Sequence, residues 1–154
     1  MNSAIRFIVI LGILLGSLSW AKAEDSLINT NDSLFSSNEY AIDGYDVVAY
    51  FNEGKAVKGS EQFKVQHKGV QFYFSSEANQ AAFKESPEKY EPQYGGYCAY
   101  AVSKGSTAGV DPTVFDVVDG KLYLNYNKDV QKKWRAEMKK HIQRADANWP
   151  KVLK

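Results

Sequence analysis

Two segments of the chain place apolar residues at every second position on both sides of a turn, which is the pattern of a β-hairpin. In residues 62–74 the turn is Lys68-Gly69, and phenylalanines and valines alternate with polar residues before and after it. In residues 115–124 two β-rich runs flank Asp119-Gly120, a strong hairpin signal. The pattern therefore predicts two antiparallel hairpins.

Helical patterns follow each predicted hairpin. Ser75-Ser76 offers an N-cap, and acidic residues follow in the first turn, so a helix is predicted to continue through Phe83. Ser86-Pro87 is predicted to end this helix. Asn127 is predicted to cap a long last helix over residues 128–148. Apolar residues recur there at spacings of three and four, and this stripe is expected to face the sheet. Its members are Val130, Trp134, Met138, His141 or Ile142, and Ala145.

The order of these elements indicates the fold class. Packing starts at residues 40–51, which contain the turn signal Asp43-Gly44. The apolar run after this turn fits either a buried strand or a short helix. Strands followed by helices predict a small α+β domain over residues 40–150. In this domain antiparallel hairpins pack against two or three helices, and the C-terminal helix is long.

The first 23 residues have the pattern of a secretory signal. A basic start precedes an apolar run of 14 residues at 7–20, and Ala21-Lys22-Ala23 has the A-x-A form of a cleavage site. A membrane-spanning helix needs about 20 apolar residues, so cleavage after Ala23 is favoured over an uncleaved anchor. We expect an exported protein, periplasmic or secreted, without a membrane span after cleavage. The polar residues 24–39 are predicted to form a flexible leader.

The charge balance argues against nucleic acid as a partner. The chain holds 19 Lys and Arg against 18 Asp and Glu, a formal net charge of +1. Such a balance lacks the basic footprint of a nucleic-acid-binding domain. Lysines concentrate in the last quarter, but acidic residues and a tryptophan interrupt them, which is typical of a solvated helix face.

Candidate chemistry gathers in residues 94–105, which hold the single cysteine, Cys98. Tyr94, Tyr97 and Tyr100 recur at three-residue spacing, so on a helix they would share one face. Gly95-Gly96 lets the backbone turn sharply or approach another group closely. An unpaired thiol in an oxidising compartment pairs between chains, lies buried or binds something. The alternative is that Cys98 is a small core residue.

The region around the first hairpin resembles the YHS domain. The resemblance rests on residues 67–76, HKGVQFYFSS, followed by Phe83 and by residues 87–90, PEKY. Further segments look like the exported YHS-domain proteins of Gram-negative bacteria, so that the resemblance covers roughly residues 40–150. These segments are residues 44–51, 95–101, 119–125 and 147–150.

The resemblance implies a metal site, because YHS domains occur beside metal-handling modules that include copper-transporting ATPases. Many YHS domains carry two cysteines, and the corresponding places here hold Val47 or Val48 and Phe74-Ser75. Cys98 is left as the one thiolate. The chain has no CxxC or HxxxH pair, which disfavours structural zinc. A thiolate with one imidazole suits Cu(I).

We therefore predict an exported protein that binds a soft transition metal, with copper as the first choice, and does not catalyse a reaction. Cys98 is the anionic soft ligand, His67 is the second ligand, and Tyr97 and Tyr100 form a wall that limits access. His141 is interpreted as a helix-surface or core-edge residue. The expected partner is a protein that donates or accepts the metal.

Two alternatives stay open at this point. In the first, the domain is a metal-free module that binds a protein or a small ligand, and His67 is a surface turn residue. In the second, less favoured, Cys98 is a nucleophile with His67 as its base, oriented by a carboxylate such as Asp43 or Asp46.

Overall fold

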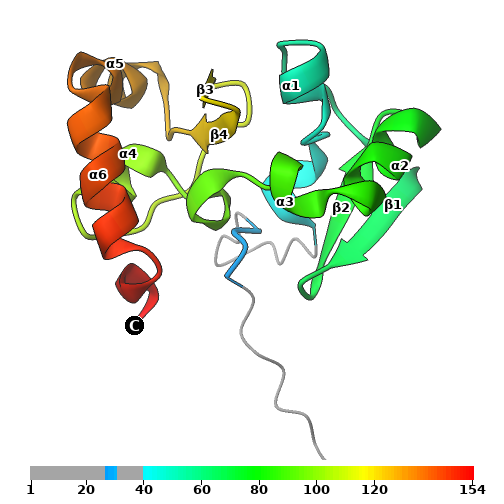
Figure 1. Ribbon diagram of the computed structural model, residues 1–154, viewed down its shortest axis with the longest axis horizontal. Helices are drawn as coiled ribbons and strands as arrows, with labels where there is room; N and C mark the ends of the chain where they lie inside the picture. Colours follow the sequence, from blue (N-terminus) through cyan, green and yellow to red (C-terminus); the bar gives the residue numbers. More distant parts are fainter. Residues whose placement is uncertain (1–26, 31–39) are drawn as a thin grey trace, which may run out of the picture.

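The computed structural model describes residues 27–30 and 40–154 (Figure 1). The predicted signal at residues 1–23 lies outside this part, as does most of the predicted leader. No helix in the described part is long and apolar enough to cross a membrane. The fold is α+β, as predicted, with two antiparallel hairpins and α-helices of very different length.

The first predicted hairpin is confirmed. Strands β1 (Ser60–His67) and β2 (Val70–Phe74) pair antiparallel, and His67 lies opposite Val70. Lys68 and Gly69 form the turn with φ of 49° and 81°. Positive φ at both turn residues is the geometry that matches the twist of paired strands.

The apolar face of this hairpin packs against a helix. Helix α2 (Glu77–Glu85) begins where predicted, because the Ser76 hydroxyl accepts a hydrogen bond from the Asn79 N–H at 3.1 Å. Its Phe83 is fully buried and stacks on Phe72 of β2, with ring centroids 4.9 Å apart. Pro87 then starts the short helix α3 (Pro87–Tyr90).

The run at residues 40–51 forms short helical turns and no strand. A 3₁₀ turn, η1 (Ala41–Gly44), precedes helix α1 (Ala49–Asn52). The η1 turn lies beside β2, where the rings of Tyr40 and Tyr73 stack with centroids 5.1 Å apart, and Tyr50 of α1 packs on Phe115 at 4.7 Å.

The buried carboxylate of Asp46 connects α1 to the end of β2. One carboxylate oxygen accepts the N–H groups of Val48 and Ala49 at 2.9 and 3.3 Å. The other accepts the Ser75 N–H and hydroxyl at 2.8 and 2.7 Å and the Asn79 amide at 2.8 Å. Asp46 is 0% exposed, so a single carboxylate satisfies five donors inside the domain.

The second predicted hairpin is also confirmed. Strands β3 (Phe115–Val118) and β4 (Lys121–Leu124) pair antiparallel about Asp119 and Gly120, whose φ values are 51° and 71°. This hairpin is a separate two-stranded sheet. Between the hairpins lie η2 (Gln93–Gly96) and helix α4 (Ala99–Ser103).

The predicted long last helix is divided in two. Helix α5 (Lys128–Ala136) ends before Glu137, whose φ of −134° and ψ of 43° are not helical, and α6 (Met138–Asn148) restarts after it. The division lets α5 bury Trp134 against Tyr123 of β4 while α6 packs along α4. The chain ends in a 3₁₀ turn, η3 (Lys151–Leu153).

The prediction of two or three helices corresponds to the longer helices of the structure. There are six α-helices in residues 40–154, but α1, α3 and α4 are no longer than five residues. The longer helices are α2, α5 and α6; the sequence pattern located α2, and it predicted one helix over the residues that form α5 and α6. The amphipathic stripe is buried at Trp134, His141 and Ala145.

Residues 27–30, which the sequence assigns to the flexible leader, lie against the domain. Ile28 and Asn29 are 7% and 5% exposed. The Asn29 N–H donates to the Gly95 carbonyl at 2.8 Å, and its side-chain amide donates to the Gly96 carbonyl at 3.2 Å. These four residues are therefore part of the packed structure.

Candidate functional site

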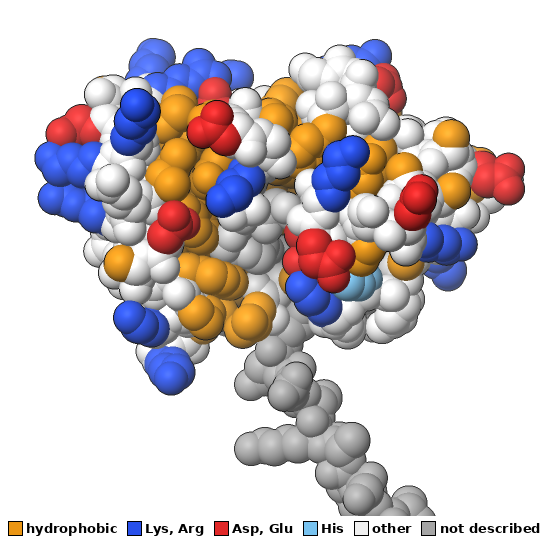
Figure 2. Space-filling view, viewed as in Figure 1, with side chains coloured by type: hydrophobic (Ala, Val, Ile, Leu, Met, Phe, Trp, Pro, Cys, Tyr) orange, Lys and Arg blue, Asp and Glu red, His pale blue; other side chains and the backbone are white. Residues whose placement is uncertain are grey.

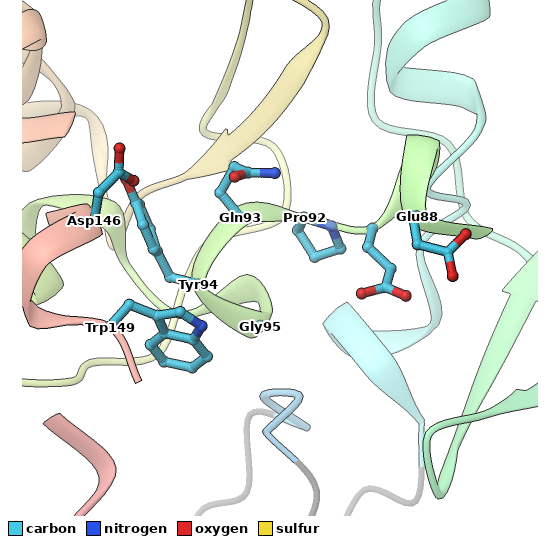
Figure 3. A pocket seen from close by; sticks show the side chains of 8 residues that line it. Glu88, Pro92, Gln93, Tyr94, Gly95, Asp146 and Trp149 are labelled. Atoms are coloured by element: carbon cyan, nitrogen blue, oxygen red, sulfur yellow. The ribbon is translucent and has the colours of Figure 1, made fainter. Parts of the chain in front are cut away.

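An open pocket of about 290 Å³ lies between the part of the molecule that contains the first hairpin and the part that contains α6 (Figure 3). One wall comes from α3 and the segment after it, and the opposite wall comes from the end of α6. Its lining residues are Glu88, Glu91, Pro92, Gln93, Tyr94, Gly95, Asp146 and Trp149. Concave sites of this kind between substructures are the usual place for ligands.

On the first wall, Glu91 is held by a histidine and a lysine. Its Oε1 lies 2.5 Å from His67 Nε2, and its Oε2 accepts a hydrogen bond from Lys68 Nζ at 2.8 Å. Burial raises the pKa of Glu91, but the hydrogen bonds from Lys68 and His67 outweigh burial and leave that pKa below its ordinary value. Glu91 is therefore ionised at neutral pH.

On the opposite wall, Asp146 accepts a hydrogen bond from the Tyr94 hydroxyl at 2.8 Å. Burial, and then this hydrogen bond, raise the pKa of Tyr94, so the phenol stays a protonated donor. Trp149 places its ring beside Tyr94, with ring centroids 6.2 Å apart. Figure 3 shows the two rings and the Asp146 carboxylate on one side of the pocket and Glu88 on the other.

The pocket lining favours a cation. It carries three carboxylates and two aromatic rings, and no Lys, Arg or His is among its lining residues. Aromatic faces and carboxylates both attract positive charge. In residues 27–30 and 40–154, no three His, Cys, Asp or Glu side chains gather so as to hold a metal ion. The lining of the pocket therefore presents negative charge and aromatic faces to a ligand.

Cys98, the predicted soft ligand, lies in the core. It is 1% exposed and directly precedes α4, and its Sγ lies 3.6 Å from Asn125 Oδ1. The same oxygen accepts the Tyr100 N–H at 3.2 Å. Asn125 is fully buried, and its Nδ2 has no hydrogen-bond partner in the described part of the chain. The packing of Cys98 is that of a small core residue.

His67, the predicted second ligand, lies at the edge of the pocket. Its ring packs against Phe72 and Phe83, at 6.0 and 5.4 Å between centroids, and its Nε2 is engaged with Glu91. Its polar partner is therefore different from that of Cys98. A metal ion shared by Cys98 and His67 stays a prediction.

The carboxylate that orients His67 is Glu91, so the expectation of Asp43 or Asp46 in that role is wrong. Asp46 is already saturated by donors from α1, Ser75 and Asn79. Five donors leave a carboxylate with no acceptor site to spare for an imidazole.

The three tyrosines of the central segment do not share a helix face. Tyr94 and Gly95 adopt left-handed backbone angles, with φ of 56° and 59°, and α4 begins only at Ala99. Tyr97 packs against Trp149, with centroids 6.0 Å apart. Tyr100 packs against His141 of α6 at 5.0 Å. Whether Tyr97 and Tyr100 shield a metal stays a prediction.

His141 lies in the core, between α6 and α4. It is 3% exposed, and its Nδ1 lies 3.0 Å from the Ser103 hydroxyl. Burial, followed by the charge of Lys104, lowers the pKa of His141. A neutral buried imidazole with a hydroxyl partner is a packing residue, which agrees with its interpretation as part of the core edge.

The sequence analysis singled out Tyr94 and Gly95 but missed the other residues that form the pocket. Glu91, Asp146 and Trp149 carry its charge and its aromatic wall, and none was a candidate. Trp149 stood in a segment that supported the resemblance, which was the one available signal. Nothing local in the sequence relates Glu91 to Asp146, because only the tertiary packing brings α3 and α6 to the same pocket.

Comparison with known families gives one match. The family model of the YHS domain matches residues 48–94. The matched part includes the first hairpin, His67 and the Glu91 wall of the pocket, and it ends before Cys98 and Asp146. YHS domains are generally associated with metal-related proteins and are not known as catalytic domains. No curated protein and no solved structure matched the chain.

Proposed function

We propose that this chain is a binding protein without catalytic activity, and that its pocket takes a small organic cation with an ammonium or guanidinium group. The observation that carries the proposal is a pocket with carboxylates on both walls, two aromatic rings and no cation of its own. Among residues 27–30 and 40–154, Asp146 receives one hydrogen bond, from Tyr94, which leaves acceptor sites on its oxygens for a ligand.

The size of the pocket limits the ligand. A volume of about 290 Å³ lies at the lower end of the range for small-molecule sites, roughly 300–1,000 Å³. A single amine or guanidine fits this space, either free or as the side chain of a peptide. The carboxylates of Glu88 and Asp146, which make no ion pair in the described part of the chain, would pair with its charge, and the half-buried Trp149 would contact its apolar part.

Asp146→Asn tests the pocket by removing one charge while keeping the side-chain shape. We expect arginine methyl ester or agmatine to bind about 10–100-fold more weakly to this variant, because a hydrogen bond to a charged group contributes about 1.5–3 kcal/mol. Binding is measured by calorimetry and by the fluorescence of Trp149. Asp129→Asn is the matched control, since Asp129 is an exposed carboxylate on α5, away from the pocket.

Two results would contradict the pocket proposal. One is equal loss of affinity in Asp146→Asn and Asp129→Asn. The other is equal binding of a guanidinium ligand and a neutral analogue of the same shape, such as butylguanidine and butylurea. Either result would show that the charge of Asp146 does not select the ligand.

A second candidate function is the binding of copper by Cys98 with His67. The match to a family associated with metal-related proteins and the single thiol of the chain support it. An exported location, as the N-terminal sequence predicts, would leave this thiol without an internal disulfide partner in an oxidising compartment. The partner in this case would be a protein that donates or receives the metal.

The copper hypothesis predicts that Cys98→Ser abolishes tight Cu(I) binding and that His67→Gln weakens it. The measurement is an anaerobic Cu(I) titration against a competing chelator, with circular dichroism to verify that each variant is folded. Cys98 is buried, so a folded Cys98→Ser protein is required before a loss of binding counts. Equal and weak binding by the parent and by folded Cys98→Ser would exclude this candidate and leave the pocket proposal unaffected.

A further inference from the structure

A band of exposed cations covers the outer faces of α5 and α6 and the chain end. Residues 128–154 contain nine Lys and Arg against three Asp and Glu, and all nine side chains are exposed. Figure 2 shows that blue Lys and Arg side chains gather along the outer edge of the part of the molecule that holds α5 and α6. In residues 40–97, by contrast, eight acidic residues stand against six basic ones. The positive charge of the domain is therefore concentrated on one side.

Three of the nine cations are neutralised locally. Lys132 pairs with Asp129, Lys140 pairs with Glu137, and Arg135 pairs with Asp116 of β3. The other six have no carboxylate within ion-pair distance in the described part of the chain, and they form what we call the basic face. Its members are Lys128, Lys133, Lys139, Arg144, Lys151 and Lys154.

The side chains of the basic face fit a broad anionic surface better than a shaped partner. Five of the six are lysines, which act as flexible point charges and lack the planar, bidentate geometry of arginine. They are spread over two helices and a terminal turn, and the pocket of the domain lies elsewhere. A partner of defined shape, such as a nucleic-acid strand or an acidic peptide, would be expected to bind in a groove lined by arginines.

We propose that the basic face docks this domain on an anionic phospholipid bilayer. The argument is charge complementarity, since each lysine or arginine near an anionic membrane adds an attraction of more than the thermal energy. Six such side chains on the part of the domain formed by α5, α6 and the chain end would orient it, with this part toward the lipid. This inference does not depend on the ligand of the pocket.

The test is co-sedimentation of the chain from residue 24 onward with vesicles of phosphatidylglycerol and phosphatidylcholine, and with vesicles of phosphatidylcholine alone. The variant carries Lys133→Glu, Lys139→Glu and Arg144→Glu. The matched control carries Lys55→Glu, Lys64→Glu and Lys84→Glu, which change the net charge equally at exposed positions around the first hairpin. We expect at least about 100-fold weaker binding for the variant and a much smaller loss for the control.

Raising the salt concentration from 50 to 300 mM should also release the parent protein from the anionic vesicles, because exposed charges are screened. Equal loss in variant and control would overturn the proposal, since net charge alone would then govern binding. Equal binding to neutral vesicles would also overturn it. Binding to nucleic acid or to an acidic polypeptide without binding to the vesicles would assign the basic face to another partner and reject the lipid.

Discussion

Replacing Asp46 with alanine should lower the free energy of unfolding by about 3–5 kcal/mol, because it leaves buried donors without an acceptor. The lost carboxylate accepts from the first turn of α1 and from the residues between β2 and α2, so both attachments fail together. Total stabilities of about 5–15 kcal/mol make this a large fraction. Thermal and urea unfolding followed by circular dichroism measure the effect.

Asp111→Ala is the matched control for Asp46→Ala. Asp111 also accepts two hydrogen bonds, from the Thr113 N–H and hydroxyl at 2.9 and 2.7 Å, but it is exposed. We expect this control to cost about 1 kcal/mol or less, because water replaces the lost acceptor. Asp46→Asn keeps the shape of the side chain but replaces one acceptor oxygen with an amide N–H₂, which would face the donors of either α1 or Ser75 and Asn79. This variant should therefore also be less stable than the parent protein. Equal stability losses for Asp46→Ala and Asp111→Ala would contradict the proposed role of the carboxylate.

The elements predicted correctly are those that a short stretch of sequence determines. Lys68-Gly69 and Asp119-Gly120 adopt positive φ, and each defines a hairpin with its immediate neighbours. The hydroxyl of Ser76 and the amide of Asn127 cap α2 and α5 through hydrogen bonds to residues three positions ahead. These signals depend on local backbone geometry and are therefore readable without the tertiary structure.

The break at Glu137 could not be read in the same way. Residues 128–148 contain no glycine or proline, and the apolar spacing continues across the break. The helix divides because Trp134 packs on Tyr123 while His141 packs on Tyr100, which are distant parts of the chain. Tertiary packing overrides a helical pattern here.

The candidate site was hidden for a related reason. Sequence analysis concentrated on Cys98 because cysteine is chemically distinctive, but the structure buries it beside Asn125. Carboxylates are common in any sequence, so Glu91 and Asp146 carried no signal until α3 and α6 were placed around one pocket. His67 was identified, and its partner Glu91 was not, because the two meet only across the hairpin and the end of α3.

Gly95 of η2 contacts residues 27–30, and a substitution at this contact should also cause a large loss of stability. Gly95 has φ of +59°, and a Cβ built on it would lie 1.9 Å from the Leu27 carbonyl oxygen. The sequence had indicated that Gly95-Gly96 allows a sharp turn or a close approach, and the structure shows both. Any side chain here would collide with the backbone of the N-terminal segment.

Gly95→Ala should therefore detach residues 27–30 from the domain as well as strain the turn. Left-handed backbone costs an alanine about 1–2 kcal/mol, and losing the burial of Ile28 costs about 1.5–3 kcal/mol more. We expect a total loss of stability of about 3–5 kcal/mol and loss of hydrogen-exchange protection at the Asn29 amide, which donates to Gly95.

Gly54→Ala separates strain from collision. Gly54 has a similar φ of +65°, but nothing lies within 4 Å of the Cβ that the substitution adds. The control should therefore show the strain alone, about 1–2 kcal/mol, with the Asn29 amide still protected. If Gly95→Ala and Gly54→Ala lost equal stability and Asn29 stayed protected in both, residues 27–30 would contribute nothing to the fold. The opposite result would extend the domain beyond the limit at residue 40 that the sequence suggested, because Ile28 belongs to the same hydrophobic cluster as Phe72 and Phe83.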